Sequence, residues 1–310
     1  MPSGMLFSIM KKLPLIFLLF FSLELKAGCD MCTLYLGMHP NQTKNSIGIK
    51  YRISEYKLTN SHNHSANNEV HSSNVEEKRI FQTAELWAQF MPMCRLQIIA
   101  VMPYSMNSVE QNNKVIDSYN NLGDLQIINR YQVYRSKDDD EFQKQISLGI
   151  GIKVPTGNYQ EKSRTGIIDP HIQNGTGSWD VLLNTSLLIK NEKYGFNQEL
   201  NIKLNSSNKY EYKFANRYSS ASSAFLFFKY KRISIQPSLT AMLEYSDYDL
   251  SRELSVYYSN GTTLYGQSTL DLYYRRFIFN VNASMPVFEN LNDESASNRY
   301  RIGIGINYVM

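Results

Sequence analysis

From residue 45 onward, apolar and polar residues alternate along the chain in short segments. Between residues 196 and 205, for example, Phe196, Leu200 and Ile202 alternate with polar residues such as Asn197. A period of two is typical of β-strands that have one apolar and one polar face, and no segment keeps a period of 3.6 long enough to predict a helix. The pattern predicts twelve strands, at residues 45–57, 76–91, 94–104, 122–134, 142–155, 178–190, 194–205, 213–230, 233–246, 263–275, 277–287 and 298–308.

The connections between these strands alternate in length, which separates a membrane barrel from a soluble β-sandwich. The long ones are 58–75, 105–121, 156–177, 206–212, 247–262 and 288–297, whereas the others are short turns around Pro92, Lys137, Glu192, Lys231 and Arg276. Short turns on one side, long loops on the other and an even strand number are typical of outer-membrane barrels. We therefore predict an all-β protein: a transmembrane antiparallel up-and-down β-barrel over residues 45–310, with long extracellular loops and short periplasmic turns.

Closure and orientation follow from this architecture. Hydrocarbon does not tolerate an open sheet edge, so the strand at 45–57 is expected to pair with the strand at 298–308. Aromatic residues favour the same orientation, because such barrels carry aromatic girdles at both interfaces. One predicted girdle lies beside the short turns and contains Phe90, Tyr134, Phe142, Tyr194, Phe228, Tyr230, Tyr273, Tyr274 and Phe277.

The N-terminus has the pattern of an export signal. Lys11 and Lys12 precede an apolar run over 13–23, and small residues follow at Ala27 and Gly28. This order predicts a secretory signal peptide over residues 1–27 and export to the cell outer membrane of a diderm bacterium. A lipoprotein with lipid on Cys29 is the alternative. Residues 28–44 then form a periplasmic segment, either a plug that folds into the lumen or a tail.

Composition narrows the function classes. The 310 residues include 19% charged and 13% aromatic residues, and carry a net charge of +4. The mean hydropathy of −0.37 argues against a helical membrane bundle, and the scattered Lys and Arg give no basic groove for nucleic acid. No serine-hydrolase elbow or zinc-protease helix motif is present in the sequence, so we expect no enzyme activity.

Alternation also assigns side chains to the lumen. The inward positions carry both signs of charge and so predict no simple preference for cations or anions. The charged or polar residues predicted to line the lumen are Lys50, Arg52, Thr83, Glu85, Lys153, Glu199, Lys203, Glu244 and Asp271. Twelve strands predict a narrow lumen, between side-chain-filled barrels and open porins.

Three glycine-containing segments carry a resemblance to a known family. They are Leu122–Asp124 (LGD), Gly149–Gly157 (GIGIKVPTG) and Gly175–Asp180 (GTGSWD). They resemble the outer-membrane transporter family linked to the meta pathway of phenol degradation. The resemblance covers about 45–310 and implies a barrel for passive transport of small hydrophobic or aromatic molecules. The expected partners are the lipid bilayer, the small solute and the outer-membrane assembly machinery, and the expected state is a monomer.

The cysteines are the basis for a second hypothesis about function. Cys29, Cys32 and His39 precede the barrel, and Cys94 lies in a turn predicted on the same periplasmic side. Sulfur ligands with one imidazole suit copper or zinc, so these four residues are a candidate metal site. The simpler interpretation is a Cys29–Cys32 disulfide with no cofactor. A surface-binding barrel that uses its long outer loops is a further alternative to transport.

Overall fold

The computed structural model describes the chain from Lys44 onward. Within that range it leaves out 67–68, 138–139, 160–161, 164–165, 168–169, 257–258 and 292–295, and gives only the backbone of the other residues between 59 and 76, between 161 and 169, and at 296. The predicted signal peptide at 1–27 and nearly all of the predicted segment 28–44 therefore lie outside the described residues.

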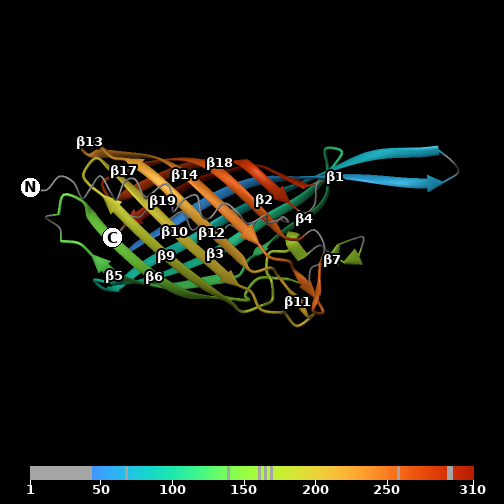
Figure 1. Ribbon diagram of the computed structural model, residues 1–310, viewed down its shortest axis with the longest axis horizontal. Helices are drawn as coiled ribbons and strands as arrows, with labels where there is room; N and C mark the ends of the chain where they lie inside the picture. The colour runs from blue at the N-terminus through green and yellow to red at the C-terminus, as the bar shows by residue number, and fades with distance from the viewer. Residues whose placement is uncertain are drawn as a thin grey trace, which may run out of the picture.

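Twelve long strands form one closed antiparallel barrel, which confirms the predicted fold class. Each strand pairs with its neighbours in the sequence, and β1 pairs with β19 to close the barrel, with Lys50 opposite Gly305. Figure 1 shows the strands tilted around the barrel axis. The barrel strands are β1 (Ser46–Ala66), β2 (Glu69–Met93), β3 (Leu96–Gln111), β5 (Leu125–Arg135), β6 (Gln143–Val154), β9 (Asp180–Lys190), β10 (Tyr194–Leu204), β12 (Arg217–Leu226), β14 (Ile233–Ser246), β17 (Gly261–Tyr274), β18 (Phe277–Leu291) and β19 (Ala296–Val309).

Smaller elements decorate the two ends of the barrel. At the long-loop end, β4 (Lys114–Leu122) pairs with β3, β7 (Lys162–Ser163) pairs with β8 (Gly166–Ile167), and β11 (Tyr212–Lys213), β15 (Leu250–Ser251) and β16 (Leu254–Ser255) form a small sheet. A single turn of 3₁₀ helix, η1, covers Pro170–Ile172. At the short-turn end, β13 (Phe228–Tyr230) pairs with the start of β14. No helix in the described part of the chain is long and apolar enough to span a bilayer.

Two of the predicted long loops are wrong, because strands continue through them. Residues 58–75 belong to a hairpin in which β1 and β2 stay paired out to Ala66 opposite Glu69, and this hairpin projects beyond the barrel (Figure 1). Residues 105–121 form the β3–β4 hairpin, whose turn places Asn112 and Asn113 in the left-handed region that asparagine tolerates. These extensions carry polar residues on both faces, so a pattern for membrane strands does not detect them.

The predicted strand at 213–230 is also wrong as one element. It divides into β12, which ends at Leu226, and β13, which begins at Phe228. The amide of Phe227 leaves the ladder and donates to the carbonyl of Lys193 in the neighbouring turn, at 2.6 Å. The predicted strand at 233–246 has the same bounds as β14.

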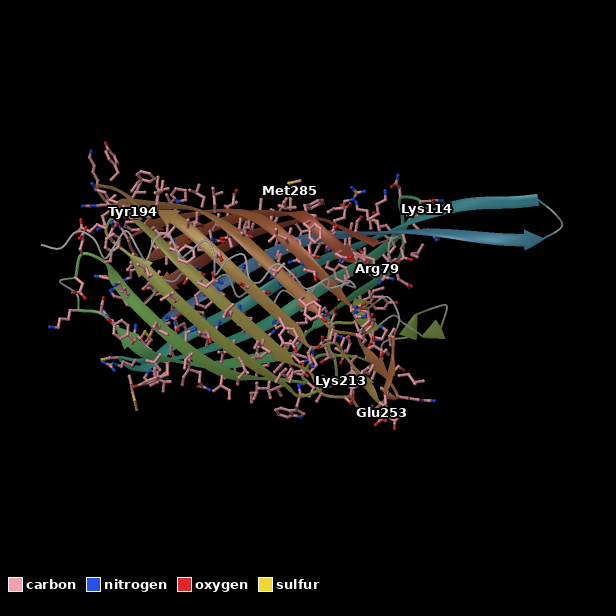
Figure 2. All side chains as sticks on the ribbon, viewed as in Figure 1. Arg79, Lys114, Tyr194, Lys213, Glu253 and Met285 are labelled. Carbon is pink, nitrogen blue, oxygen red and sulfur yellow. The ribbon has the colours of Figure 1, made fainter. Side chains whose placement is uncertain are left out.

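The outer wall is apolar and the inner wall is mostly polar. On β6, Ile150 is 60% exposed on the outside, whereas Ser147 and Lys153 are buried on the inside. Figure 2 shows Met285 on the outside of the wall and Tyr194 at the short-turn end. The described chain begins and ends at this same end, where the amide of Met310 donates to the carbonyl of Asn45 at 2.9 Å. Tyr273 departs from the predicted girdle because its hydroxyl donates to the inward-facing Gln236.

Candidate functional site: the lumen and its two mouths

A compact ionic cluster lies on the inner wall near the long-loop end. The ammonium Nζ of Lys153 is 2.9 Å from Oδ2 of Asp124 and 2.6 Å from Oδ2 of Asp180. Lys203 places its Nζ 3.8 Å from the same oxygen of Asp180. All four side chains are buried. Two carboxylates thus balance two ammonium groups, which is the condition under which buried charges are tolerated.

Asp124 also fixes the loop that follows β6. Its Oδ1 accepts a hydrogen bond from the amide of Gly157 at 2.9 Å, and its Oδ2 accepts from the amide and the hydroxyl of Thr176 at 3.0 and 2.8 Å. Burial by itself would raise the pKa of the Asp124 carboxyl, but Lys153 and these hydrogen bonds outweigh it and hold the pKa below its usual value. Asp124 therefore serves as an ionised anchor for both ends of the loop over 156–177.

Close backbone contacts explain the glycines around this anchor. A Cβ added to Gly157 would lie 2.8 Å from Cα of Gly175 and 2.9 Å from the carbonyl carbon of Gly123. Only glycine allows three backbones to approach this closely without displacement. The segments Leu122–Asp124, Gly149–Gly157 and Gly175–Asp180, which carry the family resemblance, thus meet at one place on the wall.

A second buried carboxylate joins three long loops above the barrel. Oδ2 of Asp249 is 2.7 Å from Nε2 of His171 and accepts from the hydroxyl of Tyr212 at 2.5 Å, while Oδ1 accepts from the amide of Ala215 at 2.7 Å. The amide of Asp249 donates to Oγ of Ser259 at 2.8 Å. Burial would raise the pKa of Asp249, but His171 and these donors outweigh it and lower the pKa. We call these residues the loop clasp.

A cavity of about 130 Å³ lies between the ionic cluster and the loop clasp. Two pairs of opposite charge line it, Arg52 with Glu85 at 2.6 Å and Lys153 with Asp124 at 2.9 Å, and Arg217 adds a further cation. Phe81 and Phe214 add aromatic surface, and Phe214 also packs edge-on against His171 with ring centroids 5.7 Å apart. This outer cavity therefore combines charged and aromatic side chains in its walls.

Apolar side chains interrupt the polar inner wall deeper in the barrel. One cluster combines residues of β2, β3, β5 and β9, namely Trp87, Ile99, Val101, Ile128 and Leu182. A second cluster lies on β12, β14 and β17 and contains Ala221, Met242 and Tyr265. The interior of a transmembrane barrel is usually polar, so two apolar clusters there depart from that pattern. Ile99 and Ala221 are fully buried within them, whereas Trp87 and Val101 keep 8% and 7% exposure.

Arg301 is a charged residue that other side chains hold beside the second apolar cluster. Its guanidinium donates to both carboxylate oxygens of Glu244 at 3.0 Å and to the hydroxyl of Tyr265 at 2.7 Å. The guanidinium carbon is also 3.9 Å from the centroid of the Tyr265 ring. Bidentate pairing and ring stacking hold this arginine in place.

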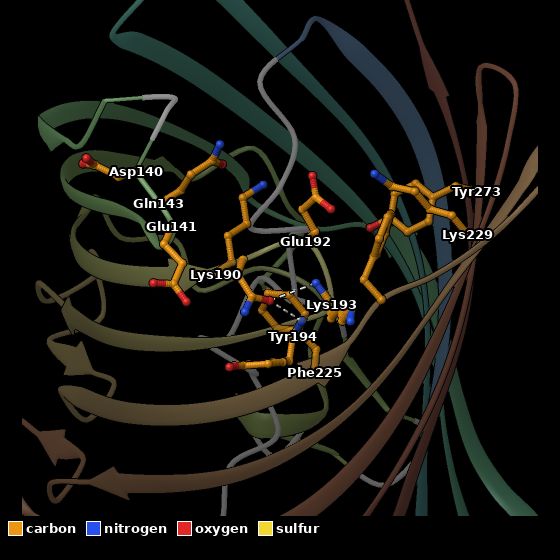
Figure 3. Close-up of a pocket in the computed structure, with 12 residues that line it drawn as sticks. Asp140, Glu141, Gln143, Lys190, Glu192, Lys193, Tyr194, Phe225, Lys229 and Tyr273 are labelled. Atoms are coloured by element: carbon orange, nitrogen blue, oxygen red, sulfur yellow. Dashed lines mark hydrogen bonds between the residues drawn. The ribbon is translucent and has the colours of Figure 1, made fainter.

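The opposite, periplasmic mouth is wider. A cavity of about 940 Å³ opens there, and Figure 3 shows Lys190, Lys229 and Tyr273 around it. Gly195 makes room for the ring of Phe225, which lies where a Cβ at position 195 would be. The acidic residues of this mouth are Asp140, Glu141 and Glu192, all exposed on turns. The cavity at the short-turn end thus has a larger volume than the outer cavity.

The structure gives each predicted lumen residue a position, while its contact with a solute stays a prediction. Arg52 pairs with Glu85, Lys153 and Lys203 share Asp180, and Glu244 binds Arg301. Lys50 is in register with Glu85, and Thr83 lines the outer cavity. Glu199 is buried within the electrostatic range of Arg130, and Asp271 accepts a hydrogen bond from Asn280.

The predicted metal site receives no test from the described residues. Cys29, Cys32 and His39, and with them the predicted disulfide, lie outside those residues. Cys94 is a free, exposed cysteine at the β2–β3 turn. Within the described ranges, no group of three or more His, Cys, Asp or Glu side chains could hold a metal ion.

Sequence reasoning missed most of the anchoring residues. Asp124 and Asp180 could have been predicted as anchors, because each ends a glycine-containing segment and an aspartate there often caps or anchors a turn. His171 and Asp249 are 78 positions apart by their numbering, and nothing local connects them. Trp87 and Tyr265 follow the same alternation as lipid-facing residues on other strands, so pattern alone does not place them inside.

Comparisons with known proteins support the fold. An outer-membrane channel from Pseudomonas putida F1 has a similar structure, with a TM-score of 0.62 over 88% of this chain and 100% of that chain, at 13% sequence identity. The translocator domain of the autotransporter NalP from Neisseria meningitidis gives a TM-score of 0.45 at 9% identity, covering 88% of this chain and 91% of that one. A mutant of the monoaromatic hydrocarbon channel TodX gives 0.38 at 9% identity, covering 86% and 90%.

The likeness to the Pseudomonas putida channel shows a shared barrel fold alone. No protein-family model and no curated protein matches the sequence.

Proposed function

We propose that this protein is an outer-membrane channel through which small, hydrophobic molecules pass passively, with no chemical step. The observation that carries the proposal is a closed transmembrane barrel whose inner wall bears apolar clusters between a wide and a narrow opening. The fold shared with an outer-membrane channel supports a transport role. The meta-pathway resemblance supports small aromatic compounds as the solute class. Export by residues 1–27, insertion by the outer-membrane assembly machinery and a monomeric state belong to the same proposal.

Selection in this proposal occurs at the outer cavity. A cavity of about 130 Å³ admits a solute of a few ring atoms and excludes oligosaccharides. Paired charges around it, such as Arg52 with Glu85, attract a passing ion less strongly than single charges would. A neutral solute then reaches Trp87 and Val101 without first losing a strong hydrogen-bond partner.

Planar-bilayer recordings with the purified protein test this function. We expect a small ionic conductance that a neutral monoaromatic solute reduces. Phe214→Ala removes one wall of the outer cavity and should raise conductance about twofold, because flow depends steeply on the narrowest section. Phe228→Ala, on the exposed lipid-facing girdle, is the matched control. No conductance for a folded protein, or equal behaviour of both variants, would argue against a channel.

A second recording addresses the solute class. Val101→Thr keeps the side-chain shape and introduces a hydroxyl into the apolar cluster, and Ile99→Thr introduces one with a side chain one heavy atom smaller. The block by the aromatic solute should weaken several-fold while the ionic conductance stays unchanged. Leu254→Ser changes an exposed residue at the long-loop end and should leave the block as it is. A block that no lumen variant alters would contradict a hydrophobic pathway.

A surface-binding role is the second candidate, because the β1–β2 hairpin projects well beyond the barrel (Figure 1). Deleting residues 60–75 should abolish binding of a surface partner and leave conductance intact. Metal handling at Cys29, Cys32, His39 and Cys94 stays a separate prediction. Thiol titration with metal analysis of the mature protein, before and after mild reduction, tests it.

A further inference from the structure

Two neighbouring periplasmic turns carry four cations. The turn between β13 and β14 contains Lys231 and Arg232, and the turn between β17 and β18 contains Arg275 and Arg276. Each turn has two residues, since Tyr230 pairs with Ile233 in the first and Tyr274 with Phe277 in the second. Ile233 and Tyr274 are themselves partners across β14 and β17. The two turns are therefore side by side, and we call Lys231, Arg232, Arg275 and Arg276 the cationic rim.

Within the described part of the chain, no acidic side chain forms an ion pair with the cationic rim. All four side chains are exposed. The ion pairs found among the described residues, which extend to 4.0 Å, include none of these four, whereas Lys153 and Arg301 inside the barrel are paired. The acidic residue closest in sequence is Asp271, which is 4% exposed and accepts from Asn280 on the inner wall. The rim thus presents four like charges to its surroundings.

Aromatic side chains surround these cations on the lipid-facing side. Tyr230 is 69% exposed, Phe228 is exposed two residues before it, and Phe277 is exposed beside Tyr274. The ammonium of Lys231 lies 5.4 Å from the Tyr230 ring centroid, and the guanidinium of Arg275 lies 5.4 Å from that of Tyr274. Exposed tyrosines in a barrel mark the membrane interface, where lipid headgroups lie. The cationic rim is therefore level with headgroups and faces them.

The two turns share a backbone conformation. Lys231 and Arg275 have φ angles of 52° and 54°, in the left-handed region where glycine or asparagine is less strained. The same first turn position holds a cation in both hairpins. Arg276 is held by a hydrogen bond to the hydroxyl of Tyr308 at 3.0 Å, which fixes it near the strand end and leaves its charge uncompensated.

We infer that the cationic rim binds the phosphate headgroup of an anionic phospholipid in the periplasmic leaflet. Arginine guanidinium groups donate two parallel hydrogen bonds to phosphate oxygens, and lysine adds a point charge. The neighbouring rings of Tyr230, Tyr274 and Phe277 pack against the glycerol and upper acyl chains. Clusters of four or more cations at a membrane surface attract anionic lipids in this way. The site is independent of what passes through the lumen.

The test titrates the purified full-length protein, in mild detergent, with phosphatidylglycerol or with phosphatidylcholine of the same chains, and counts bound lipids by native mass spectrometry. Wild type should prefer phosphatidylglycerol. The variant Lys231→Gln, Arg232→Gln, Arg275→Gln, Arg276→Gln should lose about tenfold in phosphatidylglycerol affinity and keep its phosphatidylcholine affinity. Raising the salt concentration should weaken the wild-type preference, because the site is exposed.

A matched control removes four cations from the long-loop end instead: Lys114→Gln, Lys213→Gln, Arg252→Gln and Arg299→Gln, of which Figure 2 labels Lys114 and Lys213. It has the same net charge as the test variant and should bind lipid like wild type. An equal loss in both variants, or no preference in wild type, overturns the inference. Displacement by inorganic phosphate at the lipid's concentration would also overturn it in favour of a free-anion site. If the fourfold variant does not fold, the two double variants and the wild-type salt titration decide.

Discussion

Charged side chains are buried and paired at one end of the barrel and exposed at the other. At the long-loop end, Lys153 and Asp249 are buried and each contacts several partners that join different loops. At the short-turn end, Lys231 and Arg275 stay exposed. The difference follows from connection length. Long loops have no membrane or ladder to hold them and require internal anchors, whereas a two-residue turn is fixed by its strands and leaves its side chains to the surroundings.

The largest effect is expected from Lys153→Met. Removing this ammonium leaves Asp124 and Asp180 buried with less compensation, so the free energy of unfolding should fall by about 3–5 kcal/mol. Denaturant titration of the detergent-solubilised protein, followed by tryptophan fluorescence, measures it. Lys144→Met, at an exposed position on the same strand, is the control. Equal stability of the two variants would mean that the cluster anchors nothing.

Gly195→Val probes packing at the short-turn end. The new side chain would occupy the space of the Phe225 ring and force it towards the periplasmic mouth. Overpacking of this kind costs about 1–3 kcal/mol, and the displaced ring should also reduce the ionic conductance. Gly266→Ala is a suitable control, because its Cβ would meet only Val287 at 3.2 Å. A stable variant with unchanged conductance would show that the Phe225 ring can move aside without destabilising or narrowing this mouth.

The loop clasp should make the free energy of unfolding depend on pH. The pKa of Asp249 is lowered on folding, so its stabilisation is present above the unfolded value of about 3.9 and is lost as the pH falls through the lower, folded value. Asp249→Asn should remove about 1–2 kcal/mol at neutral pH and flatten the acid limb of the stability profile. Asp140→Asn, on an exposed turn, should leave that limb unchanged. Asp124, whose pKa is also lowered, should keep its own part of the acid limb in this variant. An acid limb as steep in Asp249→Asn as in wild type would exclude Asp249 as a source.

The smallest effect is expected at the cationic rim. Because Lys231, Arg232, Arg275 and Arg276 are exposed, replacing all four by Gln should leave stability in neutral detergent unchanged within error. The same denaturant titration measures it, with Lys153→Met as the reference for a charge whose removal destabilises the protein. A large loss of stability would mean that these charges hold the turns themselves, and the contrast between the two ends would disappear.

Most of the barrel was predictable because its strands obey a two-residue period and a fixed membrane thickness. β14 and β10 kept their predicted bounds to within one residue, since turns with polar or cationic residues end them. The β1–β2 and β3–β4 extensions were not predictable from that rule, because outside the bilayer a hairpin needs no apolar face. The lumen assignment of Lys153 followed from alternation, but its partner Asp180 required knowledge of which strands become neighbours.

The pairing of β1 with β19 has a consequence for the order of assembly. Every other pair in the barrel joins strands that are close in sequence, whereas this seam joins Ser46 to Val309. Bringing such distant segments together costs roughly 2 kcal/mol more in loop-closure entropy than forming a local hairpin. We therefore expect local hairpins to form first and the seam to close last. Until then, both unpaired strands expose backbone amides and carbonyls, so the growing sheet remains open at β1 and β19 while it enters the membrane.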